Sequence, residues 1–452
     1  MNKKIHLTRR HFLMTSLSAG AVVFVAACAP KQPPAPEQPA VEKPEEEAKP
    51  APVKAQEINF LCRADIRPAY AADEAIETWN ANNESQVVVD EPVADAPVDV
   101  RVQAAQAAGD LPWDGFAVVS APRATVPWQR RGLFQPFDDY IASSLIPNAD
   151  KVLPAIIPTI KQSVSIEGKV YGIPGNVGSI QLAWFVEPLE AIGVTEQLET
   201  WDEVYEAAVK VKETSPELMP FGSAGGPICD LYSIIWGSMD DPFDAEDLVD
   251  IRSEESIWGL AWMRKMVEEG LMYDTPNTGL SQWLRRDWAM ITSFDVAGTM
   301  AQQTFGMDAV ENGIALRRWK GEPKAGTPFW INSCVLFDKC NNPQGMTDFY
   351  LWWFGPDNDV TGKQITEVAA KPCYTYTYEK FVQGQPEFEW QNTAIDLVAN
   401  SAWFRETIHQ PTQETITRQY LDRVYDLQMA FEPQAWMDEC YEEIKEEIAK
   451  QR

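Results

Sequence analysis

Histidine is nearly absent from this sequence of 452 residues, which contains only His6, His11 and His409. A zinc site or a catalytic dyad that needs two histidines would have to use the extreme N-terminus, so we exclude both. The sequence also lacks the GxGxxG, GxxxxGK(S/T), HExxH and GxSxG motifs of nucleotide-binding proteins, metalloproteases and serine hydrolases. We therefore predict that the protein is not an enzyme and has no catalytic residues, no cofactor and no metal.

Basic residues are scarce as well. The sequence has 38 Lys and Arg against 67 Asp and Glu, and its formal net charge is -29. A surface this acidic repels phosphate backbones, which excludes nucleic acid as a partner. Apolar residues make up 45% of the chain, enough for a large buried core, and the length allows two or three domains.

The first 27 residues have the layout of an export signal. Lys3, Lys4, Arg9 and Arg10 precede an apolar stretch from Phe12 to Ala27, which is short for a membrane span. Residues 8–14 resemble the twin-arginine export motif, with Met in place of the usual final Lys. Residues 25–28 resemble a bacterial lipobox, whose cysteine, here Cys28, receives a lipid. We expect a twin-arginine lipoprotein signal peptide over residues 1–27.

Residues 28–56 are predicted to form a lipidated cysteine followed by a tether. Eight prolines lie among Glu, Lys, Gln and Ala in this stretch, a composition that favours extended, solvated chain. Removal of the signal leaves 34 basic and 67 acidic residues, a net charge of -33. Six cysteines remain besides Cys28, which permits disulfides in an exported protein but does not require them.

From residue 57 the sequence alternates between strand and helix patterns. Strands are predicted at 58–62, 87–89 and 115–119, and helices at 72–83 and 98–108. This rhythm favours an α/β fold with a parallel sheet and right-handed crossovers.

Further along the chain, Thr200 and Glu203 fit a capping box at the start of a helix. Another helix is predicted over 254–269, with Ile257, Leu260, Ala261 and Val267 facing inward. In the last helix, an inward face is formed by Trp436, Cys440, Ile444 and Ile448.

One segment is similar to the start of a calcium-binding loop. Residues 357–362 place Asp, Asp, Thr and Gly at four of the expected positions, but position 12, where a Glu would complete the site, is Val368. We favour a simpler role for Asp357, as the cap of the helix that follows.

Aromatic residues are abundant, with 17 Trp, 13 Tyr and 19 Phe. Most must be core residues, but indole rings in an exported protein also stack on the apolar faces of sugars, while neighbouring polar groups bind the hydroxyls. Trp330 beside Asn332, and Trp403 beside Phe404 and Arg405, combine both chemistries outside an obvious helical stripe. A role in the core remains open for each of them.

Several segments, taken in order, resemble the extracellular solute-binding proteins of ABC importers, the class that includes maltose-binding protein. The matching motifs are GxLxPLDDY at 132–140, GKxYGIP at 168–174, TWDE at 200–203, xxAM at 288–291 and NPxxxxxFxxW from 342 to 353. The resemblance covers about residues 57–452. Trp184-Phe185 replaces the usual YN, and residues 328–333 depart from the family's GGWG strand.

The resemblance implies a two-lobe α/β fold of the type II periplasmic-binding-protein class, with a ligand cleft between lobes joined by crossing hinge segments. It assigns residues 57–174 and 295–350 to lobe 1, and residues 175–294 and 351–452 to lobe 2. Ligands of open α/β sheets bind beyond the carboxyl ends of strands, so side chains there become candidates. The candidate ligand-binding residues are Arg63, Asp65, Arg67, Ser120, Arg123, Asn176, Asp230, Trp236, Asp295, Trp330, Asn332 and Trp403.

The tryptophans would stack on the ligand and the other residues would bind its hydroxyls. The implied function is capture of a solute, with a sugar or oligosaccharide favoured, and delivery to the permease subunits of an ABC transporter. We expect a monomer that is held at the extracytoplasmic face of the cell membrane, at the cell surface or in the periplasm, by its N-terminal lipid only. Two alternatives stay open: an exported glycan-active hydrolase and a surface lipoprotein without a transport role.

Overall fold

The computed structural model describes the body of the chain in several stretches. These are residues 57–62, 67, 70–90, 97–121, 125–224, 228–273, 279–294, 296–306, 309–314, 326–368, 371–385, 391, 395, 398–399, 401 and 410–450. The predicted signal peptide, Cys28 and the tether lie outside the described residues.

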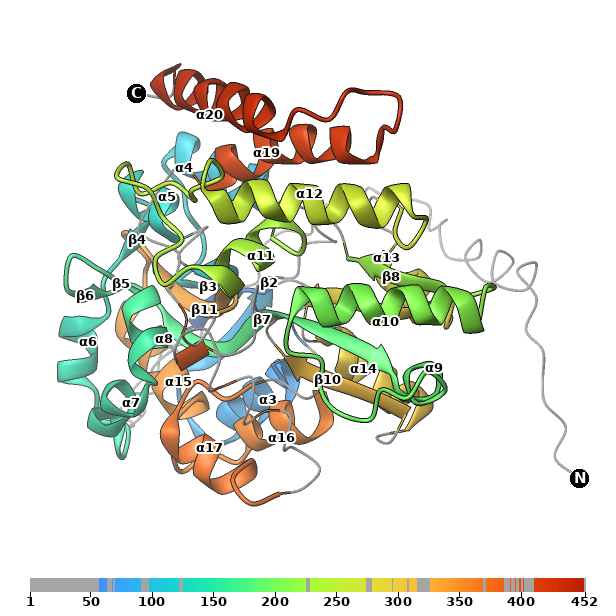
Figure 1. Ribbon diagram of the computed structural model, residues 1–452. Helices are drawn as coiled ribbons and strands as arrows, with labels where there is room; N and C mark the ends of the chain where they lie inside the picture. The colour runs from blue at the N-terminus through green and yellow to red at the C-terminus, as the bar shows by residue number, and fades with distance from the viewer. Residues whose placement is uncertain are drawn as a thin grey trace, which may run out of the picture. The chain divides into compact units, whose positions relative to one another are not determined.

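A nine-stranded sheet runs through the described body, with the central order β2-β1-β3-β11-β7-β9-β8 (Figure 1). In addition, β10 pairs with β7 and β4 pairs with β11. The strands of this sheet are β1 (Glu57–Leu61), β2 (Gln86–Asp90), β3 (Gly115–Ala121), β4 (Phe134–Gln135), β7 (Ile173–Phe185), β8 (Met219–Ser223), β9 (Trp288–Phe294), β10 (Val310–Ile314) and β11 (Phe329–Phe337). A separate antiparallel pair consists of β5 (Ser165–Ile166) and β6 (Lys169–Val170).

The predicted parallel sheet is only partly correct. β1 pairs in parallel with β2 and β3, and β8 pairs in parallel with β9, as the alternating pattern predicts. However, β11 is antiparallel to both β3 and β7, and β7 is antiparallel to β9. β11 enters the sheet more than 140 residues after β7 begins, a long-range pairing that local periodicity cannot predict. The fold is therefore mixed α/β.

Helices cover both halves of the sheet. Those in the first part of the chain are α3 (Ala72–Asn82), α4 (Pro97–Ala108), α5 (Thr125–Arg130), α6 (Asp138–Ser143), α7 (Ala149–Ala155) and α8 (Pro158–Ser163). The middle part contains α9 (Val186–Glu190), α10 (Trp201–Thr214), α11 (Leu231–Ser238), α12 (Glu254–Glu268), α13 (Gly279–Trp283) and α14 (Val296–Phe305). The last part contains α15 (Pro343–Trp353), α16 (Val360–Val368), α17 (Thr375–Phe381), α19 (Gln410–Tyr425) and α20 (Pro433–Lys450).

β7 connects two hydrophobic cores. Its thirteen residues pair with β11 over 173–179 and with β9 over 180–184. Ile173 and Val177 pack into a core with β1 and α15, whereas Leu182 and Trp184 pack into a second core with α10, α11, α12, α19 and α20. Figure 1 shows α12, α19 and α20 lying side by side over this second core.

The cores do not follow the predicted lobe boundaries throughout. Residues 351–452 were assigned to lobe 2, but Trp353, Phe354 and Tyr374 pack with Phe60 of β1 in the first core. Only the later part of this segment, α19 and α20, packs into the second core. The aromatic side chains of α15 cause this arrangement, because Phe349 and Trp353 each contact the ring of Phe60 edge-on.

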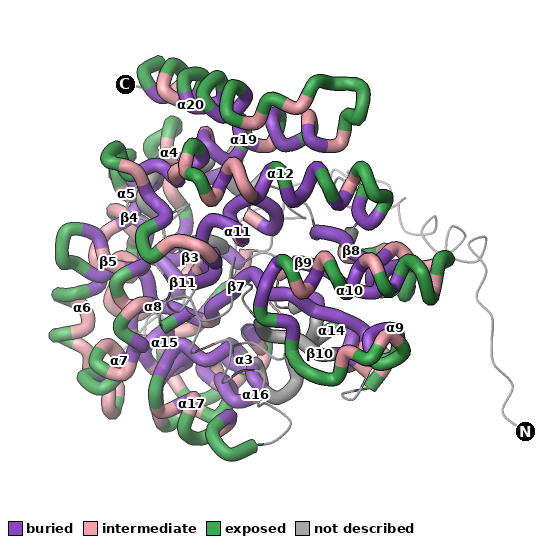
Figure 2. The backbone as a smooth tube through the Cα atoms, in the orientation of Figure 1, coloured by how far each residue is buried: buried purple, intermediate pink, exposed green. Residues whose placement is uncertain are grey.

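Several local predictions are confirmed. α3 buries Ala72, Ala75, Ile76 and Trp79 and ends at Asn82. At the start of α10, the Thr200 hydroxyl accepts a hydrogen bond from the Glu203 backbone N–H at 3.2 Å, and the Glu203 carboxylate accepts one from the Thr200 N–H at 3.1 Å. The predicted inward face of α20 is buried (Figure 2).

Two local predictions need correction. In α12, Leu260 is buried and Ile257 packs against the second core as predicted, but Ala261 is exposed, and Met263 and Met266 complete the inward face. Asp357 does not cap the helix after it: Asn358 accepts the hydrogen bond from the Val360 N–H, and Asp357 instead accepts one from Asn148 at 2.5 Å.

Candidate functional site

Polar and aromatic side chains meet where β7 pairs with β11. In this register Trp330 lies opposite Gly178, and Asn332 lies opposite Asn176. Residues two apart on a strand point to the same face, so all four positions share one face of the sheet. The Asn332 side-chain amide donates a hydrogen bond to the Asn176 side-chain carbonyl at 2.7 Å. We call Asn176, Gly178, Phe294, Trp330 and Asn332 the aromatic–amide patch.

Gly178 allows the Trp330 indole to lie across the sheet. A Cβ atom at position 178 would lie 2.2 Å from Cζ2 of Trp330, closer than any real contact. Phe294, at the end of β9, supports the indole edge-on, with ring centroids 5.1 Å apart and an interplanar angle of 86°. Trp330 is only half-buried and belongs to none of the four core clusters of the described residues.

The patch offers an aromatic surface beside two amide groups. Aromatic rings favour the apolar faces of a ligand, and amides donate and accept hydrogen bonds without carrying a charge. No general acid, general base or nucleophile is part of the patch. Its chemistry is that of binding a neutral polar ligand.

Asp230, another predicted site residue, lies just before α11 and is buried. Its Oδ2 lies 3.7 Å from Nη1 of Arg418, a residue of α19, and Nε of Arg418 contacts Asp422 at 2.9 Å. The Asp230 carboxylate is therefore held against a basic side chain rather than presented to solvent.

Two further candidates are engaged elsewhere. Trp236 is 1% exposed and packs edge-on against Phe243 with centroids 5.4 Å apart, so its ring belongs to the second core and presents almost no surface to a ligand. Arg67 forms a hydrogen bond from Nε to Oδ1 of Asp73 at 2.9 Å, which occupies its guanidinium at the surface.

The structure does not describe the side chains of the remaining predicted site residues. Ser120 lies in β3, but its side chain is outside the described residues. The candidates that lie wholly outside the described residues are Arg63, Asp65, Arg123, Asp295 and Trp403.

Sequence reasoning missed Phe294, Gly178 and Arg418. A glycine inside a predicted strand often marks a close approach of another group, which could have drawn attention to Gly178. Phe294 directly precedes the candidate Asp295. No local signal links Arg418 to Asp230, because 188 residues separate them.

A buried amine lies next to the patch on the other face of β7. Lys371 forms an isolated antiparallel bridge with Val177 and is 2% exposed. Burial lowers the pKa of the Lys371 amine well below its ordinary value, because a charge is costly away from water.

The six cysteines of the body are free thiols, and all but Cys340 are buried. Burial raises the pKa of the Cys340 thiol to about 12 and that of Cys440 to about 12, which suppresses the reactive thiolate.

Within the described residues, no group of three or more His, Cys, Asp or Glu could hold a metal ion. No helix of the described chain is long and apolar enough to cross a membrane.

Comparison with known families identifies the chain. Residues 64–360 match the family described as bacterial extracellular solute-binding protein. The chain belongs to this family. A comparison with curated proteins found no match.

Solved structures share the fold at low sequence identity. An ABC substrate-binding protein from Listeria monocytogenes, solved in complex with cycloalternan, has a TM-score of 0.70 and 14% identity, and the match covers 87% of this chain and 99% of that one. The sugar-binding protein MalE from Xanthomonas citri has a TM-score of 0.71 and 15% identity, with 88% and 98% covered. The GacH receptor of Streptomyces glaucescens, solved unliganded and with acarbose, has a TM-score of 0.70 and 14% identity, with 86% and 98% covered. The solute-binding protein is thus built on the predicted two-lobe fold.

Proposed function

We propose that this solute-binding protein captures a sugar or oligosaccharide outside the cytoplasm and delivers it to the permease of an ABC transporter. The observation that carries the proposal is the aromatic–amide patch. The half-buried Trp330 indole lies over Gly178, beside the Asn332–Asn176 hydrogen bond. A pyranose presents an apolar C–H face and a rim of hydroxyls, which match an indole face and two amides.

The relatives support the choice of ligand. The proteins from Listeria monocytogenes and Streptomyces glaucescens were solved with cycloalternan and with acarbose, and another, from Arthrobacter globiformis, is described as binding cyclic α-maltosyl-1,6-maltose. At 14% identity they share the fold, so the ligand of this chain is argued from its own patch.

Binding would close the two parts of the molecule on the solute. We divide them at β7: the part built on β1, β3, β11 and α15–α17, and the part built on β8, β9, α10–α12, α19 and α20. A ligand favours the closed arrangement only if it contacts both parts more strongly there than in the open one. Trp330 from β11 and Phe294 from β9 meet across β7, and this contact supports a ligand site between the two parts.

A thermal-shift screen tests the proposal. Maltose, mannotriose, chitin oligosaccharides and cycloalternan are the sugar probes, with free amino acids and short peptides as the comparison set. A ligand that binds only the folded protein raises the melting temperature, by an amount that grows with its concentration over Kd. We expect a rise with at least one sugar. A rise with peptides or amino acids alone would overturn the proposed ligand class.

The N-terminus supplies the proposed anchor. Replacement of Cys28 by Ser should move the protein from the membrane fraction to the soluble fraction or the medium. Replacement of Arg9 and Arg10 by Lys should leave an unprocessed precursor in the cell. Retention of the Cys28→Ser variant in the membrane fraction would contradict the lipoprotein assignment.

We propose that the mature protein acts as a monomer. Sedimentation of the soluble Cys28→Ser variant would measure its oligomeric state.

A further inference from the structure

A cavity lies away from the aromatic–amide patch, where β7 ends and β9 begins. Its volume is about 290 Å³, and its wall includes Phe185 at the end of β7 and Trp288 at the start of β9. Phe294 of the patch is at the other end of β9. Six residues of strand separate Trp288 from Phe294, or about 20 Å at 3.3 Å per residue. The two sites are therefore distinct.

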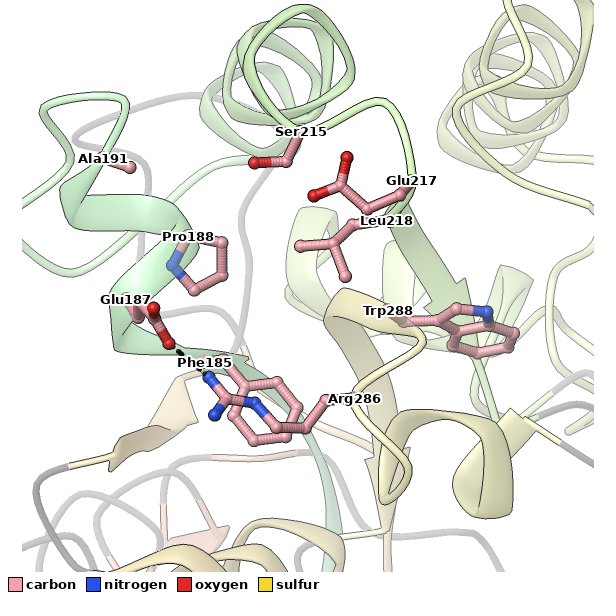
Figure 3. Close-up of a pocket in the computed structure, with 9 residues that line it drawn as sticks. All are labelled: Phe185, Glu187, Pro188, Ala191, Ser215, Glu217, Leu218, Arg286 and Trp288. Atoms are coloured by element: carbon pink, nitrogen blue, oxygen red, sulfur yellow. Dashed lines mark hydrogen bonds and ion pairs between the residues drawn. The ribbon is translucent and has the colours of Figure 1, made fainter.

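The wall of this cavity combines apolar side chains with polar and charged ones. Pro188 of α9 faces Leu218, which precedes β8, and Phe185 forms the base beneath them (Figure 3). A volume near 290 Å³ is at the lower limit of ligand pockets, so it suits a molecule smaller than an oligosaccharide. An alkyl chain would fit between Pro188 and Leu218.

Two of the charged groups at the cavity neutralise each other. The Arg286 guanidinium lies over the Phe185 ring, 4.9 Å from its centroid, and Nη2 of Arg286 forms an ion pair with Glu187 at 2.7 Å. Arg286 has a left-handed backbone conformation, with φ at 63°. The base of the cavity thus already holds one guanidinium between an aromatic face and a carboxylate.

Glu217 is the third charged group. Figure 3 shows its carboxylate projecting into the cavity from the wall opposite Pro188. Among the described residues, the Glu217 side chain forms no hydrogen bond and no ion pair. Since Arg286 is already paired with Glu187, the exposed Glu217 leaves a negative charge at the mouth of the cavity.

We propose that this cavity is a second binding site, for the alkyl-ammonium or alkyl-guanidinium group of a small cationic solute, with Glu217 as its counter-ion. The alkyl stem packs between Pro188 and Leu218, and the cation pairs with the Glu217 carboxylate. The acidity of the whole chain, with a net charge of -29, raises the local concentration of such cations. This site does not depend on the proposed sugar-binding function.

A titration with n-butylguanidinium, followed by NMR at the backbone amides of Ser215, Glu217 and Leu218, tests the proposal. N-Butylurea is the neutral control, because it has nearly the same shape and no charge. For a ligand of this size we expect a dissociation constant on the order of 1 mM for the cation and at least about fivefold weaker binding of the urea. Equal binding of the two probes would overturn the role of the charge.

Matched variants locate the site. Glu217→Gln should weaken n-butylguanidinium binding about fivefold, as loss of one exposed ion pair predicts. Glu213→Gln removes the same charge from the exposed end of α10, outside the cavity wall, and should leave the dissociation constant unchanged within about twofold. Equal effects of the two variants would show binding by general acidity and would contradict the site.

A cross-test separates this proposal from the sugar site. Trp330→Ala should leave n-butylguanidinium binding unchanged, and Glu217→Gln should leave sugar affinity unchanged. Both side chains are partly exposed, so both variants should fold, which thermal unfolding checks. Loss of n-butylguanidinium binding in Trp330→Ala would place the cation in the patch and overturn the second site.

Discussion

Trp330 and Trp236 show how differently two regions of this protein use an aromatic side chain. Trp330 lies half-buried across a glycine on the sheet, beside two amides, and outside every described core cluster. Trp236 lies in the second core, 1% exposed, against Phe243 and Tyr232. Tryptophan in this protein therefore has two roles, as a core residue and as a partly exposed aromatic surface. The burial of the ring and the backbone beside it distinguish the two roles.

Trp236→Ala should destabilise the protein most. Removal of a fully buried indole leaves a cavity, which typically costs about 3–5 kcal/mol in free energy of unfolding. Denaturant unfolding measures this loss, and Trp330→Ala is the matched variant in the patch. Sugar affinity of the folded Trp236→Ala protein should be unchanged. A stable Trp236→Ala protein with weakened sugar binding would reverse the roles of the two residues.

The sequence predicted the fold better than the site. Local signals were sufficient for α3, the capping box of α10 and the inward face of α20, because each depends on residues three or four apart. The exposure of Ala261 in α12 and the antiparallel pairing of β11 were missed, since tertiary packing decides both. Trp330, Asn332 and Asn176 were predicted as site residues and do lie together. Trp236 was also predicted as a site residue, but its side chain is buried in the second core.

Gly178→Ala tests the shape of the patch. The new Cβ would lie 2.2 Å from the Trp330 ring, so the indole must leave its place across the sheet. We expect sugar affinity to fall about tenfold, which corresponds to about 1.4 kcal/mol, by isothermal titration calorimetry. Gly132→Ala makes the same substitution in a turn far along the chain, at a positive φ of 72°, and should affect stability rather than affinity. If the Gly178→Ala variant binds the sugar as tightly as the wild type, the position of the Trp330 indole does not matter for ligand binding.

Asn332→Ala removes the cross-strand hydrogen bond of the patch. The variant loses a bond of 2.7 Å to Asn176 and one amide that can bind a ligand hydroxyl. A net hydrogen bond contributes about 0.5–1.5 kcal/mol, so we expect sugar affinity to fall about fivefold, measured in the same calorimeter. An affinity equal to that of the wild type would show that the amides only hold β7 and β11 together.

Lys371→Met should change stability by an amount that depends on pH. Burial lowers the pKa of Lys371 in the folded protein, so between that pKa and the ordinary value of about 10.4 the unfolded chain binds more protons than the folded one. Stability of the wild type therefore rises with pH across this window. Lys371→Met should be more stable than the wild type at pH 7, and the difference should shrink towards pH 10. A difference that stays constant with pH, in denaturant unfolding, would contradict the lowered pKa of the buried amine.

The central claim is that Trp330 binds the solute and does not support the core. Trp352 of α15 is the matched control, because it is also half-buried and packs on Trp79 with ring centroids 5.5 Å apart. Calorimetric titration of the best sugar from the thermal-shift screen should show at least about tenfold weaker binding for Trp330→Ala, and unchanged affinity for Trp352→Ala. The melting temperature of ligand-free Trp330→Ala should stay close to that of the wild type. A destabilised Trp330→Ala protein that retains full sugar affinity would contradict the claim.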